Sequence, residues 1–162
     1  MGRAAEVLLE CMDHVFEREG WHVSLLESVK DLTVAQAAWS PSPGRNPIWK
    51  IVEHVALWKE EEARRLRGEA PREAGWDKAH DWQDTGEATE ANWQRALRRL
   101  TEAQRTLHAA VATIPDARLD VAAPGSAAAI AARSGGPVLH DSYHCGQICY
   151  LRALQGIPAK IW

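Results

Sequence analysis

The sequence predicts an all-α protein folded as a four-helix bundle. Apolar residues recur at spacings of three and four along four long segments, which is the period of an amphipathic helix. No segment alternates apolar and polar residues strongly enough to predict a strand. The chain has 162 residues, which is the length of one domain, so we expect residues 1–162 to form a single bundle.

The first helix is predicted over residues 3–30, where apolar residues recur from Leu8 to Val29. The next segment, DLTVAQAAWSPSPGRNP, is dense in Ser, Pro and Gly, so it is predicted as a loop. Within this loop, one short turn is expected at residues 33–37. We therefore expect one long helix and a largely irregular connection before the second helix.

The second helix is predicted over residues 47–68. Asn46 is a favourable N-cap, and Pro47 suits the first helical position because proline has no N–H to leave unpaired there. Residues 68–86 have no sustained period and contain two tryptophans, Trp76 and Trp82. This segment is therefore predicted as a second long connection, and connections of such length usually have a function.

The third helix begins after Thr85 or Thr89, either of which can cap it, and ends at the proline of the motif IPDARLD. Residues 115–136 are predicted as a loop of small residues, in which AAAIAARSG has the composition of a helical turn. Pro137 then opens the fourth helix, which ends at Gly156.

The charge and the cysteines exclude several classes of protein. Lys and Arg number 19 against 22 Asp and Glu, for a formal net charge of -3, so we expect no nucleic-acid partner. No apolar stretch approaches the roughly 20 residues that span a bilayer, and the charged start does not resemble a secretory signal, so we expect no membrane partner. The cysteines are an odd set of three, which favours a reducing, cytoplasmic location.

Three histidines on apolar helix stripes predict a metal site. His140 and His144 are one helical turn apart on the fourth helix, so they project from the same face. His54 lies among the apolar positions of the second helix and also faces inward. A divalent ion would satisfy all three imidazoles in the core. Zn²⁺, Ni²⁺ and other borderline ions all suit such donors, and the sequence does not select among them.

A structural role is the alternative for each histidine taken alone, because one histidine on an apolar stripe is more often a hydrogen-bonded core residue. The metal hypothesis depends on three such residues facing inward at once. The remaining histidines have no partner one turn away and are interpreted as structural or solvated: His14, His22, His80 and His108. Cys145 and Cys149 are also one turn apart, but on another side of the fourth helix, where we expect them to pack.

The sequence resembles the DinB-like superfamily, which includes the YfiT-type proteins and related metal-dependent thiol transferases. The resemblance spans most of the chain and is carried by WKIVEHVALWKE on the second helix, TEANWQRALRRL on the third, IPDARLD after it and HDSYHCGQICYLRALQG on the fourth. It implies a bundle with up-down-down-up connectivity and a divalent metal held by three histidines. By position these are His54, His140 and His144, the residues that the helix faces also select.

The resemblance implies a function as well, because some members of the family transfer a low-molecular-weight thiol, such as bacillithiol or mycothiol, to an electrophile. The leading hypothesis is a metal-dependent thiol S-transferase with a small-molecule substrate in a pocket bordered by Trp58 and Gln147. One alternative is a hydrolase, in which metal-bound hydroxide attacks an ester or amide and Glu61 or Glu62 accepts a proton.

A second alternative is a protein that binds a metal or a small ligand without catalysis. We also expect a homodimer, which the resemblance implies. The eight tryptophans, a large aromatic inventory for one small domain, favour the same expectation. No residue is assigned a catalytic role from the sequence.

Overall fold

The computed structural model describes residues 3–18, 20–119, 121–122 and 130–158. These residues contain seven α-helices, one short 3-10 helix and no strand, which confirms the all-α prediction. In chain order the elements are α1 (Arg3–Phe16), α2 (Leu25–Val29), α3 (Val34–Ala38), α4 (Ile48–Leu66), α5 (Trp76–His80), α6 (Glu90–Ala112), η1 (Asp116–Arg118) and α7 (Ile130–Leu154). No helix in these ranges is both long enough and apolar enough to cross a membrane.

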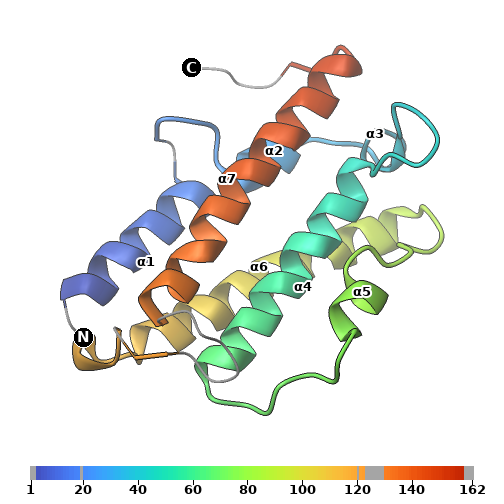
Figure 1. The fold of residues 1–162 in the computed structure, drawn as a ribbon. Helices are drawn as coiled ribbons and strands as arrows, with labels where there is room; N and C mark the ends of the chain where they lie inside the picture. The colour runs from blue at the N-terminus through green and yellow to red at the C-terminus, as the bar shows by residue number, and fades with distance from the viewer. Residues whose placement is uncertain (1–2, 19, 120, 123–129, 159–162) are drawn as a thin grey trace.

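Four long helices, α1, α4, α6 and α7, form the bundle, and α4 runs parallel to α6 (Figure 1). Near the start of both helices, Trp49 packs on Trp93 with ring centroids 5.5 Å apart. Further along both helices, Lys59 Nζ donates a hydrogen bond to Gln104 Oε1 at 2.7 Å. Residue numbers therefore rise together in α4 and α6, and a long connection has to return the chain from the end of one to the start of the other.

The last helix, α7, runs antiparallel to α4. Lys59 pairs with Asp141 at 2.5 Å, whereas Glu62, which lies further along α4, pairs with Arg133, which lies earlier on α7. The first helix lies beside α7 and points the same way (Figure 1). The four long helices thus run up, down, down and up, and the connectivity implied by the resemblance is confirmed.

The prediction of one helix over residues 3–30 is wrong, because the segment forms two helices with a break between them. The first ends at Phe16 and the second begins at Leu25. Ser24 caps the second, since its Oγ accepts a hydrogen bond from the Glu27 N–H at 3.3 Å. Phe16 and Leu25 are buried in the same core cluster, so the apolar spacing continues across the break. The periodicity reports which residues are buried and does not reveal that the backbone turns.

Two short helices lie in the predicted connections. The turn predicted at residues 33–37 is α3, which opens with a capping box between Thr33 and Gln36. The connection predicted over residues 68–86 contains α5, a helix that its irregular apolar pattern does not predict. Of the two predicted caps for the next helix, Thr89 is the one used, and its Oγ1 accepts a backbone hydrogen bond from the first turn of α6.

Both helix starts predicted at prolines are displaced. Pro47 is the N-cap of α4 instead of its first residue, because its ψ of 167° is extended. The last helix begins at Ile130, so Pro137 lies inside it. Ile130 and Ser134 are buried, and Ser134 Oγ donates a hydrogen bond to the Ile130 carbonyl at 2.8 Å, so packing of this first segment outweighs the loss of one backbone N–H. Residues 123–129 of the predicted loop lie outside the described residues.

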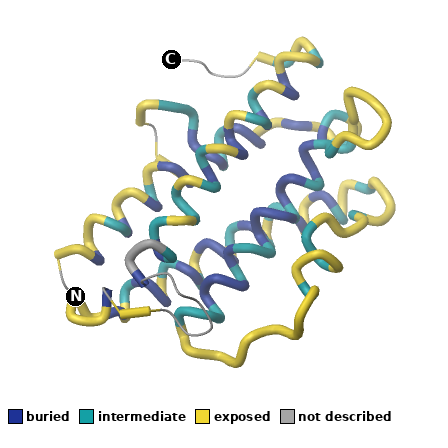
Figure 2. Tube along the Cα trace, viewed as in Figure 1, coloured by how far each residue is buried: buried dark blue, intermediate teal, exposed yellow. Residues whose placement is uncertain are grey.

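A buried lysine joins the four long helices in the core, where buried residues occupy the sides of the helices that face one another (Figure 2). Lys59 of α4 is 2% exposed and donates hydrogen bonds to Gln104 of α6 and Asp141 of α7. Its Nζ also lies 5.2 Å from the ring centroid of Phe16 in α1. Burial lowers the pKa of Lys59 and raises the pKa of Asp141, and the attraction between the two groups opposes both shifts.

The substitution Lys59→Met should destabilise the protein by about 3–5 kcal/mol, because it leaves the Asp141 carboxylate buried without its cation. Chemical denaturation followed by circular dichroism measures the change. The double variant Lys59→Met/Asp141→Leu should recover much of the loss, since no buried charge is then unpaired. A Lys59→Met protein as stable as the wild type would show that the pair does not hold the helices together.

Candidate metal centre

Three histidine side chains from α4 and α7 meet between these two helices and form a possible metal site. His54 Nε2 and His144 Nε2 each lie 3.0 Å from His140 Nε2. His54 and His144 are 7% and 3% exposed, and His140 is half-buried. The structure therefore brings together the three residues that the sequence singled out, which we call the three-histidine cluster.

Hydrogen bonds on the far nitrogens orient two of the rings. His54 Nδ1 lies 2.9 Å from Oδ1 and 3.2 Å from the backbone oxygen of Asp81. His144 Nδ1 lies 2.7 Å from Gln147 Oε1, and Gln147 Nε2 donates to Tyr143 Oη at 2.9 Å. Because the partners of both Nδ1 atoms are acceptors, each Nδ1 donates its proton and each Nε2 keeps a free lone pair. Both lone pairs are directed toward the centre of the cluster.

The donor set fits a divalent metal ion. Lone pairs of three imidazoles that face one point repel one another unless a proton or a cation lies between them. Zn–N bonds of about 2.0–2.1 Å in a tetrahedral site place two nitrogens roughly 3.3 Å apart. The 3.0 Å separations in the cluster are close to this value. Nitrogen donors suit Zn²⁺, Ni²⁺ and related ions alike, so the cluster does not fix the identity of the metal.

The imidazoles are held neutral near pH 7, as metal ligands must be. Burial, followed by the neighbouring His144 and His54 rings, lowers the pKa of His140 to about 3. Burial lowers the pKa of His144 to about 4, although the hydrogen bond to Gln147 opposes the shift. Burial also lowers the pKa of His54, and contacts with Asp81 oppose it. Protons therefore compete weakly with a metal ion for these nitrogens at neutral pH.

Two residues of the connection between α4 and α6, Asp81 and Trp82, complete the surroundings of His54, and neither is predicted from the sequence to lie in the site. Besides His54, Asp81 accepts a hydrogen bond from the Trp58 indole N–H, at 2.6 Å to Oδ1. Trp82 stacks on the His54 ring, with centroids 3.9 Å apart and planes 1° apart. The signal available in the sequence was the length of the connection and its tryptophans, because no local pattern relates Asp81 to a residue on another helix.

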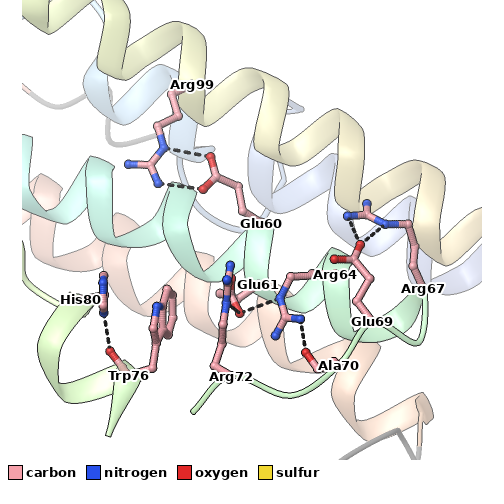
Figure 3. A network of polar contacts seen from close by, with 10 residues as sticks. All are labelled: Glu60, Glu61, Arg64, Arg67, Glu69, Ala70, Arg72, Trp76, His80 and Arg99. Atoms are coloured by element: carbon pink, nitrogen blue, oxygen red, sulfur yellow. Dashed lines mark hydrogen bonds and ion pairs between the residues drawn. The ribbon is translucent and has the colours of Figure 1, made fainter. Parts of the chain in front are cut away.

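Ion pairs at the second half of α4 hold this connection in place (Figure 3). Glu61 is buried and accepts hydrogen bonds from Arg64 Nε at 3.1 Å and from Arg72 Nη2 at 2.6 Å. The Arg72 guanidinium also lies over the Trp76 ring, which stacks on His80. These contacts fasten α5 against α4 and so place the residues after α5 beside the three-histidine cluster.

A cavity of about 450 Å³ lies next to the cluster. It is lined by Trp58, Lys59, Glu62, Arg65, Arg133, Gly136, Pro137 and His140. Of the two residues predicted to border a substrate pocket, Trp58 lines this cavity, whereas Gln147 contacts His144 and Tyr143 instead. The wall is aromatic at Trp58 and charged at Arg65, Arg133 and the Glu62 carboxylate, which lies against both guanidinium groups.

The two carboxylates considered as proton acceptors are held in ion pairs. Burial raises the pKa of Glu61, but the hydrogen bonds from Arg72 and Arg64 outweigh this effect and keep the pKa below its ordinary value. Glu62 pairs with Arg133, whose Nε donates to its Oε1 at 3.1 Å. Glu61 is not among the residues that line the cavity, and Glu62 lines it as a paired group.

The remaining histidines and the cysteine pair lie outside the cluster. His14 is exposed, His22 Nε2 lies 3.1 Å from Ser142 Oγ, His80 Nδ1 lies 2.7 Å from the Trp76 carbonyl oxygen, and His108 Nε2 lies 3.3 Å from an oxygen of Asp13. The Cys145 thiol is buried in the core and donates to the Val23 carbonyl at 2.8 Å. Cys149 packs against the same core. These positions place all six groups away from the metal ligands.

The metal-free protein should lose stability as the pH falls from about 6.5 to about 4. Histidine in an unfolded chain has a pKa near 6.5, whereas His140 and His144 have pKa values of about 3 and about 4 in the fold. Between these values the unfolded chain binds more protons than the folded one, so acid favours unfolding. Thermal melts in chelator at a series of pH values measure the effect. The variant His144→Leu should show a shallower dependence, and equal slopes for the two proteins would contradict this account.

Comparison with known proteins identifies the family. No curated protein and no solved structure matches the sequence. The family pattern of the DinB superfamily matches residues 19–148, a range that includes the whole three-histidine cluster and well over half of the chain. The protein therefore belongs to the DinB superfamily.

Proposed function

We propose that the protein is a divalent-metal-dependent thiol S-transferase, which joins a low-molecular-weight thiol of the bacillithiol type to a small electrophilic molecule. The observation that carries this proposal concerns the cavity that reaches His140. Its walls present guanidinium and indole groups, and the carboxylate that lines it, Glu62, is held by Arg133. These groups suit a small anionic thiol. A hydrolase would instead need a free carboxylate base in the cavity, and Glu62 is not free.

A divalent ion bound by the three-histidine cluster would supply acidity, because coordination to a metal removes the proton of a thiol at neutral pH. The chain itself supplies orientation. Asp81 and Gln147 hold His54 and His144 with their Nε2 lone pairs inward, and Trp82 covers one face of the His54 ring. Ligands fixed in this way lose little freedom on binding an ion.

The cavity residues favour a thiol that carries carboxylate groups. A guanidinium binds a carboxylate through two parallel hydrogen bonds. Arg133 already binds Glu62 in this way, so the group offered to a ligand is the guanidinium of Arg65, which lines the cavity with its Nη1 3.7 Å from Glu62 Oε2. Arg65 lies over the Trp58 ring, 5.6 Å from its centroid. The indole offers an apolar surface to the organic part of the electrophile. The volume of about 450 Å³ is in the range of pockets that hold small molecules.

Hydrolysis is supported less well by the same residues. A hydrolase needs a group that accepts a proton from the attacking water, and Glu61 and Glu62 are both engaged with arginines. Thiol transfer would not require such a group, because a thiol bound to a divalent ion would release its proton to water at neutral pH. Hydrolysis and ligand binding without turnover are therefore the alternative outcomes of the experiments.

Each of the substitutions His54→Ala, His140→Ala and His144→Ala should remove most of the bound metal, because each deletes one of three nitrogen donors. Elemental analysis after dialysis measures the metal content per chain. His14→Ala and His108→Ala are matched controls and should keep the wild-type content. Wild-type content and affinity in all three cluster variants would show that the cluster is not a metal site.

Cobalt-substituted protein should develop a sulfur-to-cobalt charge-transfer band when a small thiol is added, because a thiolate is a soft ligand with a characteristic absorption. Absorption spectroscopy measures the titration, and the His144→Ala variant should show no band. The variant Arg65→Ala should need more mercaptosuccinate to reach half-saturation, while its response to uncharged 2-mercaptoethanol should match the wild type.

Activity measurements on the metal-loaded protein separate the three functions. Consumption of thiol with a model electrophile is the result expected of a transferase. A cobalt spectrum that responds to pH but not to thiol, together with hydrolysis of an activated ester, would instead establish a hydrolase. Thiol binding without turnover of any electrophile tested would indicate that the protein binds its ligand without catalysis.

A further inference from the structure

Two thiol groups lie together on α7, where this helix packs against the segment that contains α2 (Figure 1). Cys145 is 2% exposed, and its thiol donates to the Val23 carbonyl oxygen at 2.8 Å. Cys149 follows one turn later, is half-buried and packs on the same core. The two thiols are in hydrogen-bonding contact with each other. We call them the α7 thiol pair, and the proposed thiol transfer uses neither of them.

The pair is poorly placed to form a disulfide. Residues four apart on a helix have Cβ atoms about 5–6 Å apart, whereas a disulfide needs them about 3.5–4.5 Å apart. Closing that gap would require α7 to distort next to His144. Contacts on both sides of the pair hold the helix in place, since Asp141 pairs with Lys59 and Arg152 donates to backbone oxygens at the end of α2. The two thiols therefore stay in contact without a bond between them.

An atom that bonds to both sulfurs can bridge the pair while α7 stays helical. Two bonds of about 2.3 Å, the length of a Zn–S bond, place two sulfurs roughly 3.8 Å apart in tetrahedral geometry. This separation is close to that of two sulfurs in contact and is nearly twice the bond of about 2.05 Å in a disulfide. Thiols prefer soft elements to hard ones. The geometry therefore favours a soft bridging atom.

The surroundings of the pair favour a bridging atom that leaves no net charge. Cys145 lies in an apolar cluster with Leu25, Val29 and Ile148. Burying a charge in such a place costs free energy unless a partner neutralises it. Among the described residues, only the three-histidine cluster brings together three or more His, Cys, Asp or Glu ligands, so a divalent ion at the pair would lack further donors. Trivalent arsenic differs from such an ion, because its bonds to thiols are covalent and its adduct with two thiols is uncharged.

We propose that the α7 thiol pair binds a trivalent arsenical, whose arsenic atom bridges the sulfurs of Cys145 and Cys149. An organic arsenical of this class carries two As–OH groups. In each step, a thiol sulfur forms a bond to arsenic and one As–OH bond breaks. The hydroxide takes up the proton that the thiol releases and leaves as water. Arsenic stays trivalent and each sulfur keeps its oxidation level, so no oxidant or reductant is needed.

Cys149 is placed to react first, because it is half-buried whereas Cys145 is almost completely covered. Its contact with the Cys145 thiol, followed by the nearby Arg152 and His22, lowers the pKa of Cys149 to about 7, although burial opposes the shift. A thiol with such a pKa is partly ionised at neutral pH, and the thiolate is the nucleophilic form. Once bound, the arsenic lies beside Cys145, so the second bond forms within one molecule at a high effective concentration.

The third cysteine provides a contrast within the chain. Cys11 is exposed on α1, whereas the other two cysteines contact each other on α7, so Cys11 offers an arsenical only one bond. An excess of a monothiol displaces an arsenical held by one bond, whereas one held by two bonds is retained. The proposal does not depend on the proposed transferase activity, since it is inferred from the α7 thiol pair alone.

Phenylarsonous acid is the probe, added to the metal-loaded full chain and followed by an excess of 2-mercaptoethanol. Mass spectrometry of the intact protein should then find one arsenical per chain, at the mass expected after loss of two waters. A thiol-specific dye should react with one cysteine of the denatured chain in place of three. The dithiol 2,3-dimercaptopropanol should remove the arsenical, because it offers two bonds of its own. A wild type that retains no arsenical would overturn the proposal.

Cys145→Ala and Cys149→Ala should each weaken retention at least about tenfold, because each leaves a single As–S bond. Cys11→Ala is the matched control and should retain the arsenical as the wild type does. Circular dichroism identifies a variant that does not fold, and Cys149→Ala, at a half-buried position, keeps the test decisive if Cys145→Ala is such a variant. Unchanged retention by Cys149→Ala, or loss of retention by Cys11→Ala, would show that the pair is not the site.

Two further measurements separate the proposal from other roles of these residues. The thiol oxidant diamide should form no disulfide between Cys145 and Cys149 in the folded Cys11→Ala protein, as peptide mapping can show. Formation of that disulfide would make the pair a redox couple and overturn the geometric argument. The absorption of cobalt-loaded protein should stay unchanged when the arsenical binds, because the bridge leaves α7 helical and His144 in place. Loss of cobalt would instead assign the arsenical to the metal centre and overturn the proposal.

Discussion

The buried ammonium group of Lys59 determines how the four long helices fit together. It reaches α6 through Gln104 and α7 through Asp141. A charge removed from water costs several kcal/mol unless its partners are well placed, so a shift of α7 along α4 by one turn would leave Lys59 and Asp141 unpaired. Because Asp141 comes directly after His140 in the chain, the same ion pair sets the height at which His140 and His144 meet His54. The pair therefore links the stability of the bundle to the geometry of the three-histidine cluster.

The orientation of the cluster has a local and a distant source. His144 is oriented by Gln147, which lies on the same helix and is positioned by the helix itself. His54 is oriented by Asp81, which is held beside it by the Trp58 indole N–H and by the contacts of Glu61 and Arg72 that fasten the connection to α4. Two ligands of one candidate site thus depend on different parts of the fold. The orientation of His144 requires only that α7 is helical. The orientation of His54 requires the folded connection between α4 and α6.

Helical periodicity makes part of this protein predictable from its sequence, whereas the features that depend on distant contacts are missed. His54, His140 and His144 could be selected because apolar spacing fixes the inner face of each helix. Asp81 and Trp82 could not, because no local pattern relates a connection to the helix on which it folds back. The break before Ser24 was hidden because the helices on either side bury residues in one core. The start of α7 was misplaced because the burial of Ile130 and Ser134 overrides the preference of Pro137.

The parallel arrangement of α4 and α6 has a consequence for how this protein can change over generations. Parallel neighbours cannot be joined by a tight turn, so the topology always includes a crossover as long as the bundle. That crossover carries Asp81 and Trp82, which contact the ring of His54. Other residues on it, such as Trp76 and Lys78, are not buried in the core. Sequence drift can therefore retune the surroundings of His54 while the helices stay intact. The residues of the crossover can change while the four long helices stay the same. One fold can therefore acquire different specificities.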